Sequence, residues 1–177
     1  MNQLYILLSP LSFDTNIEEI PVNSVGRRGK APTPTLGLVS NPLKGKNVHQ
    51  STTADLVFRC LQAIFFSKHA STASSPPWRA AAFAKRLLEC ALHLPAPTAI
   101  RALEFVRQLM VREPKLESML STEDRTQDGV YKPELEDPQL CNPFAASFWE
   151  LEVLITGHYD QTVRREARRI AEARFVI

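Results

Sequence analysis

Prolines divide much of this sequence into short segments in which apolar residues recur every three or four positions. Pro95, Pro114 and Pro143 each stand at the edge of such a segment. Proline has no amide hydrogen to donate, so helices tolerate it in their first turn or beyond their end, but poorly in their interior. No segment shows the sustained alternation of apolar and polar residues that is typical of a half-buried strand. The pattern therefore predicts an all-α fold.

The predicted helices follow one another closely after the first 50 residues. We expect them over residues 51–68, 76–94, 97–113 with a further turn through 120, 143–157, and from 161 onward. The stripe predicted to face the core in the first of these comprises Leu56, Cys60, Ala63 and Phe66, widened by Leu61, Ile64 and Phe65. The residues expected to face inward in the last are Val163, Ala167, Ile170 and Ala171. A short apolar helix is also expected at Leu4–Leu11, broken at Pro10.

Three of these helices begin with a recognisable capping residue. Ser75 precedes Pro76, Asn142 precedes Pro143, and Asp160 precedes the last helix. Proline is favoured in the first turn, and Ser, Asn and Asp side chains accept hydrogen bonds from the first unpaired amides. We therefore expect Ser75, Asn142 and Asp160 to cap their helices.

The architecture follows from the way in which amphipathic helices joined by short turns bury their apolar faces on their neighbours. We expect an irregular α-solenoid of HEAT-like or armadillo-like helical hairpins with long loops, in preference to a four-helix bundle. Three parts are predicted: residues 1–20 as the end of a preceding helical region, 21–50 as a basic loop or linker rich in Pro and Gly, and 51–177 as a helical domain.

Charge is distributed unevenly, although the whole chain carries a net charge of only +2. Residues 21–50 contain no acid and five basic residues, which are Arg27, Arg28, Lys30, Lys44 and Lys46. A flexible cationic segment can neutralise phosphates, so these five residues are candidate RNA contacts. A linker that merely keeps the chain soluble is the equally weighted alternative.

The last predicted helix carries a second basic cluster, formed by Arg164, Arg165, Arg168 and Arg169. These arginines are also candidate RNA contacts. The slightly preferred alternative is that they pair with the acidic stretch at residues 121–140, in which Glu134, Glu136 and Asp137 lie close together. That carboxylate cluster is interpreted as a solvated loop or a partner for arginines rather than as a metal site.

Motifs that carry enzymatic chemistry are absent from the sequence. Its six glycines form neither GxGxxG nor a P-loop, its three cysteines lack the spacing of a disulfide framework or a zinc site, and no run of about 18 apolar residues could span a membrane. Cys60 and Cys90 are expected to be core thiols. Cys141 stands before a predicted helix start, where the dipole would lower its pKa, and an enzyme built on it is the least favoured interpretation. We expect no catalysis, cofactor, metal, small-molecule substrate or membrane partner.

One stretch has an unusual and ordered series of residues. Residues 129–150, here called the signature segment, read GVYKPELEDPQLCNPFAASFWE, and HYDQTVRREA follows at 158–167. Upstream, residues 76–95 read PPWRAAAFAKRLLECALHLP. This series resembles the C-terminal signature of the CCAAT-binding-factor domain family, in its branch of nucleolar complex-associated proteins of the third type. The resemblance covers most of Ser51–Ala173 and is weakest over residues 21–50.

The resemblance implies a non-catalytic scaffold of the nucleolus and nucleoplasm that pairs with a sister nucleolar-complex protein. It further implies contact with pre-ribosomal proteins and pre-rRNA during maturation and intranuclear transport of the large-subunit precursor, and a longer protein with helical repeats upstream. A chromatin-associated adaptor in DNA replication initiation is the alternative.

The family has no known catalytic residues to carry over, so the resemblance implies a structural role for the signature segment. Phe144, Phe148 and Trp149 are expected to pack, and the acidic loop is expected to lie against the helices. The residues to which a structural role is assigned are Pro133, Glu136, Asp137, Pro138, Cys141, Asn142, Pro143, Phe144, Phe148, Trp149 and Glu150.

Deleting Arg27–Lys46 from the full protein is expected to weaken its association with the precursor particle. Each lost contact with a phosphate removes one counterion-release term, so the dependence of affinity on salt should become shallower. Co-sedimentation with the particle over a series of salt concentrations measures both quantities. Unchanged binding with an unchanged salt dependence would rule out an RNA role for this segment.

Overall fold

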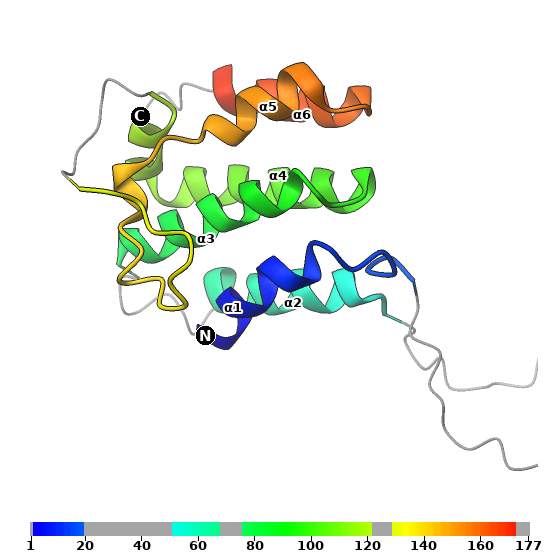
Figure 1. The fold of residues 1–177 in the computed structure, drawn as a ribbon, viewed down its shortest axis with the longest axis horizontal. Coiled ribbons are helices and arrows are strands. Elements are labelled where there is room, and N and C mark those ends of the chain that lie inside the picture. Colours follow the sequence, from blue (N-terminus) through cyan, green and yellow to red (C-terminus); the bar gives the residue numbers. More distant parts are fainter. Residues whose placement is uncertain (1, 20–50, 68–75, 122–128, 173–177) are drawn as a thin grey trace, which may run out of the picture.

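The computed structural model describes residues 2–19, 51–67, 76–121 and 129–172 (Figure 1). Within these ranges it contains α-helices and short 3-10 helices but no β-strand, which confirms the predicted all-α class. The α-helices are α1 (Asn2–Leu11), α2 (Thr53–Phe66), α3 (Pro77–Ala91), α4 (Ala96–Arg112), α5 (Trp149–Gly157) and α6 (Gln161–Glu172). The 3-10 helices are η2 (Pro114–Met119) and η3 (Pro143–Ala145). None of the helices in this part of the chain is long and apolar enough to cross a membrane.

The α-helices lie in three tiers. In Figure 1, α1 and α2 form the lowest tier, α3 and α4 the middle tier, and α5 and α6 the highest. Helix α1 packs on α3, α2 packs on α4, and α6 contacts both α4 and α5. Buried residues of all three tiers belong to one continuous core. The solenoid of HEAT-like or armadillo-like hairpins remains a prediction.

Helix α3 is buried on nearly all sides. Eleven of its 15 residues are buried, and several of them are alanines, which favour the helix and let neighbouring elements approach closely. Two of the buried residues are charged: Lys85 is 0% exposed and Arg86 is 7% exposed. A buried charge is tolerated only where partners compensate for its lost hydration. The partners of these two cations define the site described below.

Aromatic side chains join the lowest tier to the middle tier. The ring of Phe83 in α3 lies edge-on to Tyr5 of α1 and to Phe65 of α2, with ring centroids 5.2 Å apart in both pairs. Phe105 of α4 contacts Phe65 and Phe66 at centroid distances of 6.0 and 5.6 Å. Edge-to-face pairs add about 0.5–1.5 kcal/mol beyond the apolar area that they bury. These rings therefore hold α1 and α2 against α3 and α4.

The buried face of α2 differs from the predicted one. Phe58, Leu61 and Phe65 face the core, whereas Leu56 is 48% exposed and Cys60 is also exposed. Apolar residues surround much of this helix, so their spacing alone does not decide which side is buried. The two phenylalanines remove more apolar surface from water than Leu56 and Cys60 would. Ala63 is exposed as well, so the predictions that Leu56 and Ala63 lie in the core stripe and that Cys60 is a core thiol are wrong.

The N-terminal caps of α2 and α3 differ from those predicted from the sequence. Helix α2 has a capping box that the analysis of the sequence missed: Thr52 Oγ1 accepts a hydrogen bond from the Asp55 amide, and Asp55 Oδ2 accepts one from the Thr52 amide. Helix α3 has Pro76 at its cap position and no side-chain capping hydrogen bond, while Ser75 lies outside the described residues. Proline at the start presets the backbone without supplying an acceptor.

Helix α6 begins as predicted. Asp160 Oδ1 accepts hydrogen bonds from the amides of Thr162 and Val163, at 2.7 and 3.1 Å. These bonds favour the ionised carboxylate and lower the pKa of Asp160. The inward face was predicted one residue too wide, because Ala171 is exposed and the buried stripe ends at Ile170.

The helix predicted over residues 143–157 is divided in two. Asn142 adopts a left-handed backbone conformation, with φ of 51°, and makes no side-chain capping hydrogen bond to η3. The chain extends again at Ala146, and the Phe148 amide donates a 2.7 Å hydrogen bond to the Met119 carbonyl before α5 begins. A capping residue needs an extended backbone, so a left-handed Asn142 cannot serve as one. The prediction that Asn142 caps a long helix is wrong.

Replacing Phe83 with alanine is expected to lower the free energy of unfolding by roughly 3–5 kcal/mol, because the change leaves a cavity between three helices. Chemical denaturation followed by circular dichroism measures the loss. The matched control is Val130→Ala, at a residue that is 74% exposed and where a change within about 0.5 kcal/mol is expected. Equal losses in the two variants would contradict the central position of Phe83.

Candidate interaction site

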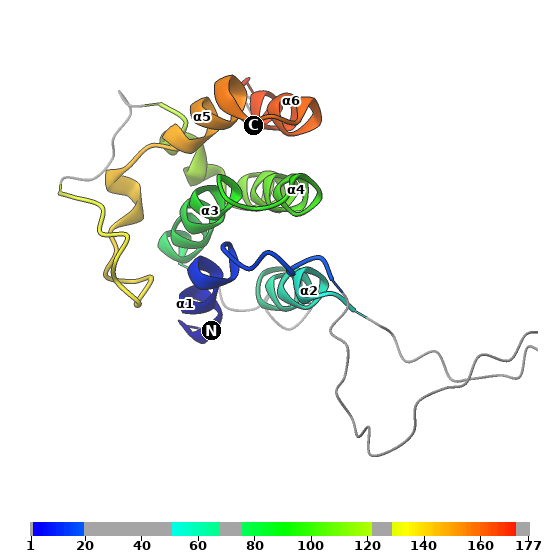
Figure 2. The same ribbon diagram turned by 45° about the vertical axis from the view of Figure 1, so that its right-hand side comes forward.

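The signature segment, residues 129–150, lies along one side of the helical tiers beside α3 (Figure 2). It contains the single turn η3, the first two residues of α5, and otherwise irregular backbone. Backbone without regular structure needs hydrogen-bond partners from elsewhere when it packs against a core. Two consecutive cations of α3, Lys85 and Arg86, supply several of these partners.

Lys85 joins α3 to the start of α5. Its Nζ donates to Glu150 Oε1 at 2.6 Å and to the Ser147 carbonyl at 2.7 Å, and the side chains of Lys85 and Glu150 are both fully buried. The rings of Trp149 and Tyr131 lie beside the ammonium group, with their centroids 5.2 and 5.5 Å from Nζ. Two aromatic faces and two oxygens therefore replace the water that this cation loses.

Burial perturbs both members of this ion pair. Desolvation raises the pKa of Glu150 and lowers the pKa of Lys85, and each charge opposes the shift of the other. Glu150 Oε2 is buried and has no hydrogen-bond partner. Because the pair carries no net charge, it is tolerated as a unit, whereas either charge alone would be left without compensation. The pair thereby joins α3 to the start of α5.

Arg86 joins three segments that are distant in sequence. Its Nη2 donates to the Tyr5 hydroxyl of α1 and to the carbonyls of Pro133 and Leu135 in the signature segment. The guanidinium carbon lies 4.2 Å from the centroid of the Tyr5 ring. Burial raises the pKa of Tyr5, which therefore remains a neutral hydroxyl. Arg86 thus holds the acidic loop against α3 through the backbone of the loop, without using its carboxylates.

Neither Lys85 nor Arg86 was predicted from the sequence to be a site residue. A signal was present, because both residues interrupt a run of alanine, leucine and phenylalanine in a segment predicted to be a buried helix. Long charged side chains usually reach solvent from such positions, and here they do not. Only the arrangement of the signature segment around α3 explains their burial.

The residues of the signature segment occupy different environments. Pro138, Cys141, Pro143, Phe148 and Glu150 are buried, and Asn142, Phe144 and Asp137 are partly buried. Pro133 and Glu136 are exposed. Trp149 is 53% exposed, so the expectation that it packs in the core is wrong. Its ring instead covers Lys85 with one face and meets solvent with the remainder, a compromise that suits an amphipathic indole.

Neither buried cysteine is poised for reaction. Cys141 is fully buried and its Sγ donates to the Pro138 carbonyl, and desolvation raises the pKa of its thiol. The predicted dipole effect is absent because η3 is a single turn. Burial raises the pKa of Cys90 to about 12, and its Sγ donates to the Leu8 carbonyl. The nucleophilic thiolate is disfavoured at both positions.

In the described part of the chain, the ion pairs formed by the candidate RNA contacts of α6 all lie within that helix. Arg165 and Arg169 form ion pairs with Glu166 of the same helix, at 3.4 and 3.1 Å. No ion pair in the described residues joins α6 to Glu134, Glu136 or Asp137. The other acids of the stretch, Glu123, Asp124 and Asp128, lie outside the described residues, so pairing of α6 with them stays a prediction. Arg165, Arg168 and Arg169 are exposed and Arg164 is partly buried. The candidates Arg27, Arg28, Lys30, Lys44 and Lys46 lie outside the described residues.

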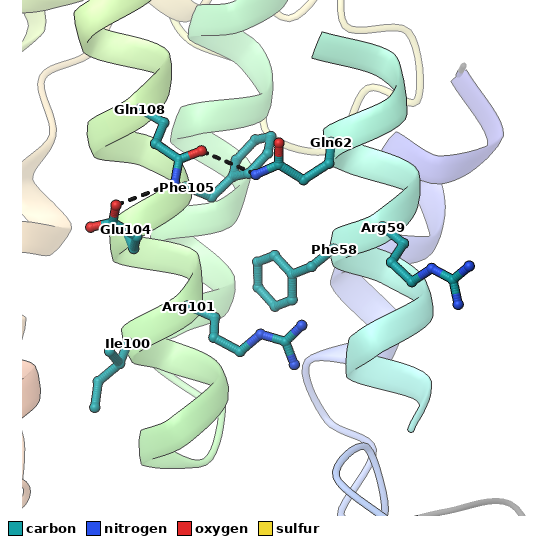
Figure 3. A pocket seen from close by; sticks show the side chains of 8 residues that line it. All are labelled: Phe58, Arg59, Gln62, Ile100, Arg101, Glu104, Phe105 and Gln108. Carbon is teal, nitrogen blue, oxygen red and sulfur yellow. Dashed lines mark hydrogen bonds between the residues drawn. The ribbon is translucent and has the colours of Figure 1, made fainter. Parts of the chain in front are cut away.

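A groove lies between α2 and α4 (Figure 3), on the other side of α3 from the signature segment (Figure 2). Its volume is about 530 Å³, and it is lined by Phe58, Arg59, Gln62, Ile100, Arg101, Glu104, Phe105 and Gln108. A second hollow of about 390 Å³ shares Gln108 and continues along α4; its other lining residues are Phe66, Arg107, Val111 and Arg112. Figure 3 shows the Phe58 ring between the two helices, below the hydrogen bond from Gln62 to Gln108.

Replacing Lys85 with methionine is expected to lower the free energy of unfolding by about 3–5 kcal/mol, because Glu150 is left buried without its counterion. The double variant Lys85→Met with Glu150→Leu should recover most of this loss, since it removes both charges and keeps similar volumes. Denaturant titration of both variants measures the coupling between the residues. Additive losses in the double variant would show that the two charges do not act as a pair.

Comparison with known proteins gives matches along nearly the whole chain. The profile of the CBF/Mak21 family matches residues 1–167. The chain is 34% identical over 133 residues to nucleolar complex-associated protein 3 of Saccharomyces cerevisiae, which covers 75% of this chain and 19% of that protein. It is 29% identical over 173 residues to the Schizosaccharomyces pombe protein of the same name, covering 98% of this chain and 21% of that protein.

A human relative extends the comparison beyond fungi. The chain is 34% identical over 116 residues to the Homo sapiens nucleolar complex protein 3 homolog, covering 66% of this chain and 14% of that protein. The aligned part therefore spans between 14% and 21% of the length of these three relatives. The family profile nevertheless covers most of this sequence, so the resemblance seen in the signature segment is confirmed and the chain belongs to the CBF/Mak21 family.

Proposed function

We propose that this chain is a non-catalytic scaffold segment of a nucleolar protein that takes part in assembly of the large ribosomal subunit. The observation that carries the proposal is its similarity, over 75% and 98% of its length, to two proteins named as nucleolar complex-associated. The names of these relatives support a location in the nucleolus and a role within a protein complex. Passage through the nucleoplasm with the precursor particle belongs to the same proposal.

The geometry fits a protein that works by presenting surfaces. The charged groups of Lys85 and Arg86 bind internal partners, and these contacts hold the signature segment in place. A rigid signature segment fixes the positions of the exposed Trp149 and Val153 on α5, at 53% and 44% exposure. A partner that binds such a preformed surface loses little conformational freedom in it. We propose a sister nucleolar-complex protein as the principal partner, and a helical-repeat architecture for the larger assembly.

The exposed arginines of α6 support a contact with precursor ribosomal RNA. Arg165, Arg168 and Arg169 lie on a short helix whose position is fixed by the burial of Val163 and Ile170. Arginine binds phosphate oxygens through two parallel hydrogen bonds, and a rigid helix loses little entropy when it does so. The basic residues between Arg27 and Lys46 are proposed to extend this contact along the RNA.

Affinity purification of the full-length protein from nucleoli is the direct test. We expect precursor RNA of the large subunit and nucleolar complex proteins to co-purify, and the combined substitution of Arg165, Arg168 and Arg169 by Glu to reduce the RNA yield severalfold, since it replaces phosphate-binding charges by repelling ones. Substitution of the same three residues by Lys is the matched control, because it keeps the charge.

The same purification separates the alternatives. Replication initiation factors in the absence of ribosomal RNA would overturn the proposal in favour of a chromatin adaptor. Equal RNA yields from the Glu and Lys variants would remove α6 from the RNA contact without affecting the rest of the proposal.

A further inference from the structure

The groove between α2 and α4 has an apolar floor, and its rim carries apolar side chains as well as arginines. Phe58 and Phe105 form its floor and are 7% and 1% exposed. In the adjoining hollow Phe66 is partly buried, and Val111 is 59% exposed although it is a large apolar residue. Apolar surface that remains open in a groove favours the binding of apolar side chains from a partner.

The polar lining of the groove has a strong excess of positive charge. Four arginines and one glutamate line the two hollows. The glutamate, Glu104, is already paired with Arg107 at 2.7 Å, and Arg101 is paired with Asp55 at 2.8 Å. Arg59 and Arg112 form no ion pair with another described residue. Within the described residues the surface therefore carries two cations without a carboxylate partner, one on each of the helices that border the groove; the guanidinium of Arg112 lies over the Phe66 ring, 5.7 Å from its centroid.

The shape of the groove suits a short helix. It follows α4 from Ile100 to Arg112, which corresponds to about 18 Å at 1.5 Å per residue, or between three and four helical turns. Two exposed polar contacts cross it, which are the hydrogen bond from Gln62 to Gln108 and the ion pair from Arg101 to Asp55. Exposed contacts of this kind contribute little to stability, so an incoming helix can displace them at small cost.

We propose that this groove binds an amphipathic helix of a partner protein that carries acidic residues on either side of its apolar stripe. The apolar stripe would cover Phe66 and Val111, and the flanking carboxylates would reach Arg59 and Arg112. This is the helix-in-groove mode of recognition, with charge selecting the partner and apolar area holding it. The inference rests on the proposed function only in assuming that the chain works through contacts.

A protein helix fits the groove better than RNA does. Nucleobases bind by stacking on exposed aromatic faces, whereas Phe58 and Phe105 are buried and the Arg101 guanidinium carbon lies 4.7 Å from the Phe58 centroid. A phosphate backbone would satisfy the arginines but would leave the apolar rim at Phe66 and Val111 uncovered. The combination of apolar floor and basic rim is complementary to an acidic amphipathic helix.

The test uses the purified full-length protein and a synthetic peptide of about 14 residues with leucine at helical spacing and glutamate at the flanking positions. We expect the peptide to bind, and expect Arg59→Glu with Arg112→Glu to weaken binding by about tenfold or more, because both changes place repelling charges beside it. Val111→Asp should weaken binding comparably. Fluorescence anisotropy of the labelled peptide gives the dissociation constants, and circular dichroism of each variant verifies its fold.

Three controls decide the outcome. Lys132→Glu makes the same charge change at an exposed residue of the signature segment, on the other side of α3 from the groove (Figure 2), and should leave peptide binding within about twofold of the wild type, since salt screens exposed charges that lie far apart. A peptide with lysine in place of glutamate should bind at least tenfold more weakly. The proposal is overturned if the lysine peptide binds equally well, if Lys132→Glu is as damaging as the groove variants, or if single-stranded RNA binds the groove in preference to the acidic peptide. None of these readouts depends on ribosome assembly, so they can fail while the proposed function stands.

Discussion

The arrangement of this protein depends on two adjacent cations placed where a packed helix would ordinarily carry apolar side chains. Lys85 and Arg86 lie within the most enclosed helix, and each is compensated by groups from a different part of the signature segment. A buried ion pair contributes little net stability compared with an apolar equivalent, but its geometry has few acceptable alternatives. The two cations therefore act mainly by specifying where the irregular segment lies. The high proportion of alanine in α3 supports this role, because small side chains let that segment approach the helix closely.

The internal use of charge separates this face of the protein from the opposite one. Around α3 the cations are neutralised by a carboxylate, carbonyl oxygens and aromatic faces, so little charge is presented to a partner. Along α2 and α4 the arginines remain at the surface and outnumber the acids that accompany them. One face is thus devoted to holding the chain together, while the other retains charge and apolar surface that other molecules can use. A protein whose work is contact needs both properties at once.

Much of the fold could be predicted from the sequence, because proline position and apolar spacing are local signals. The helix starts after Pro76 and Pro95 and the Asp160 cap are set by residues within one turn. Three features depended on contacts that spacing does not encode. The burial of Phe58 in place of Leu56 was decided by its contact with the Phe105 ring of α4, and the break before Trp149 was decided by a left-handed Asn142 and a hydrogen bond to η2. The burial of Lys85 depended on Glu150, which lies 65 residues away.

The distances along the chain between Arg86, Lys85 and their partners bear on how the protein is made. Arg86 contacts Tyr5, 81 residues before it, and Leu135, 49 residues after it, while Glu150 follows Lys85 by 65 residues. During translation, α3 leaves the ribosome well before the carbonyls and the carboxylate that will neutralise its cations. Until these groups have been synthesised, hydration of Lys85 and Arg86 is favoured over their burial, so α3 cannot be fully enclosed. The contacts that enclose α3 are therefore completed only after the signature segment has been synthesised.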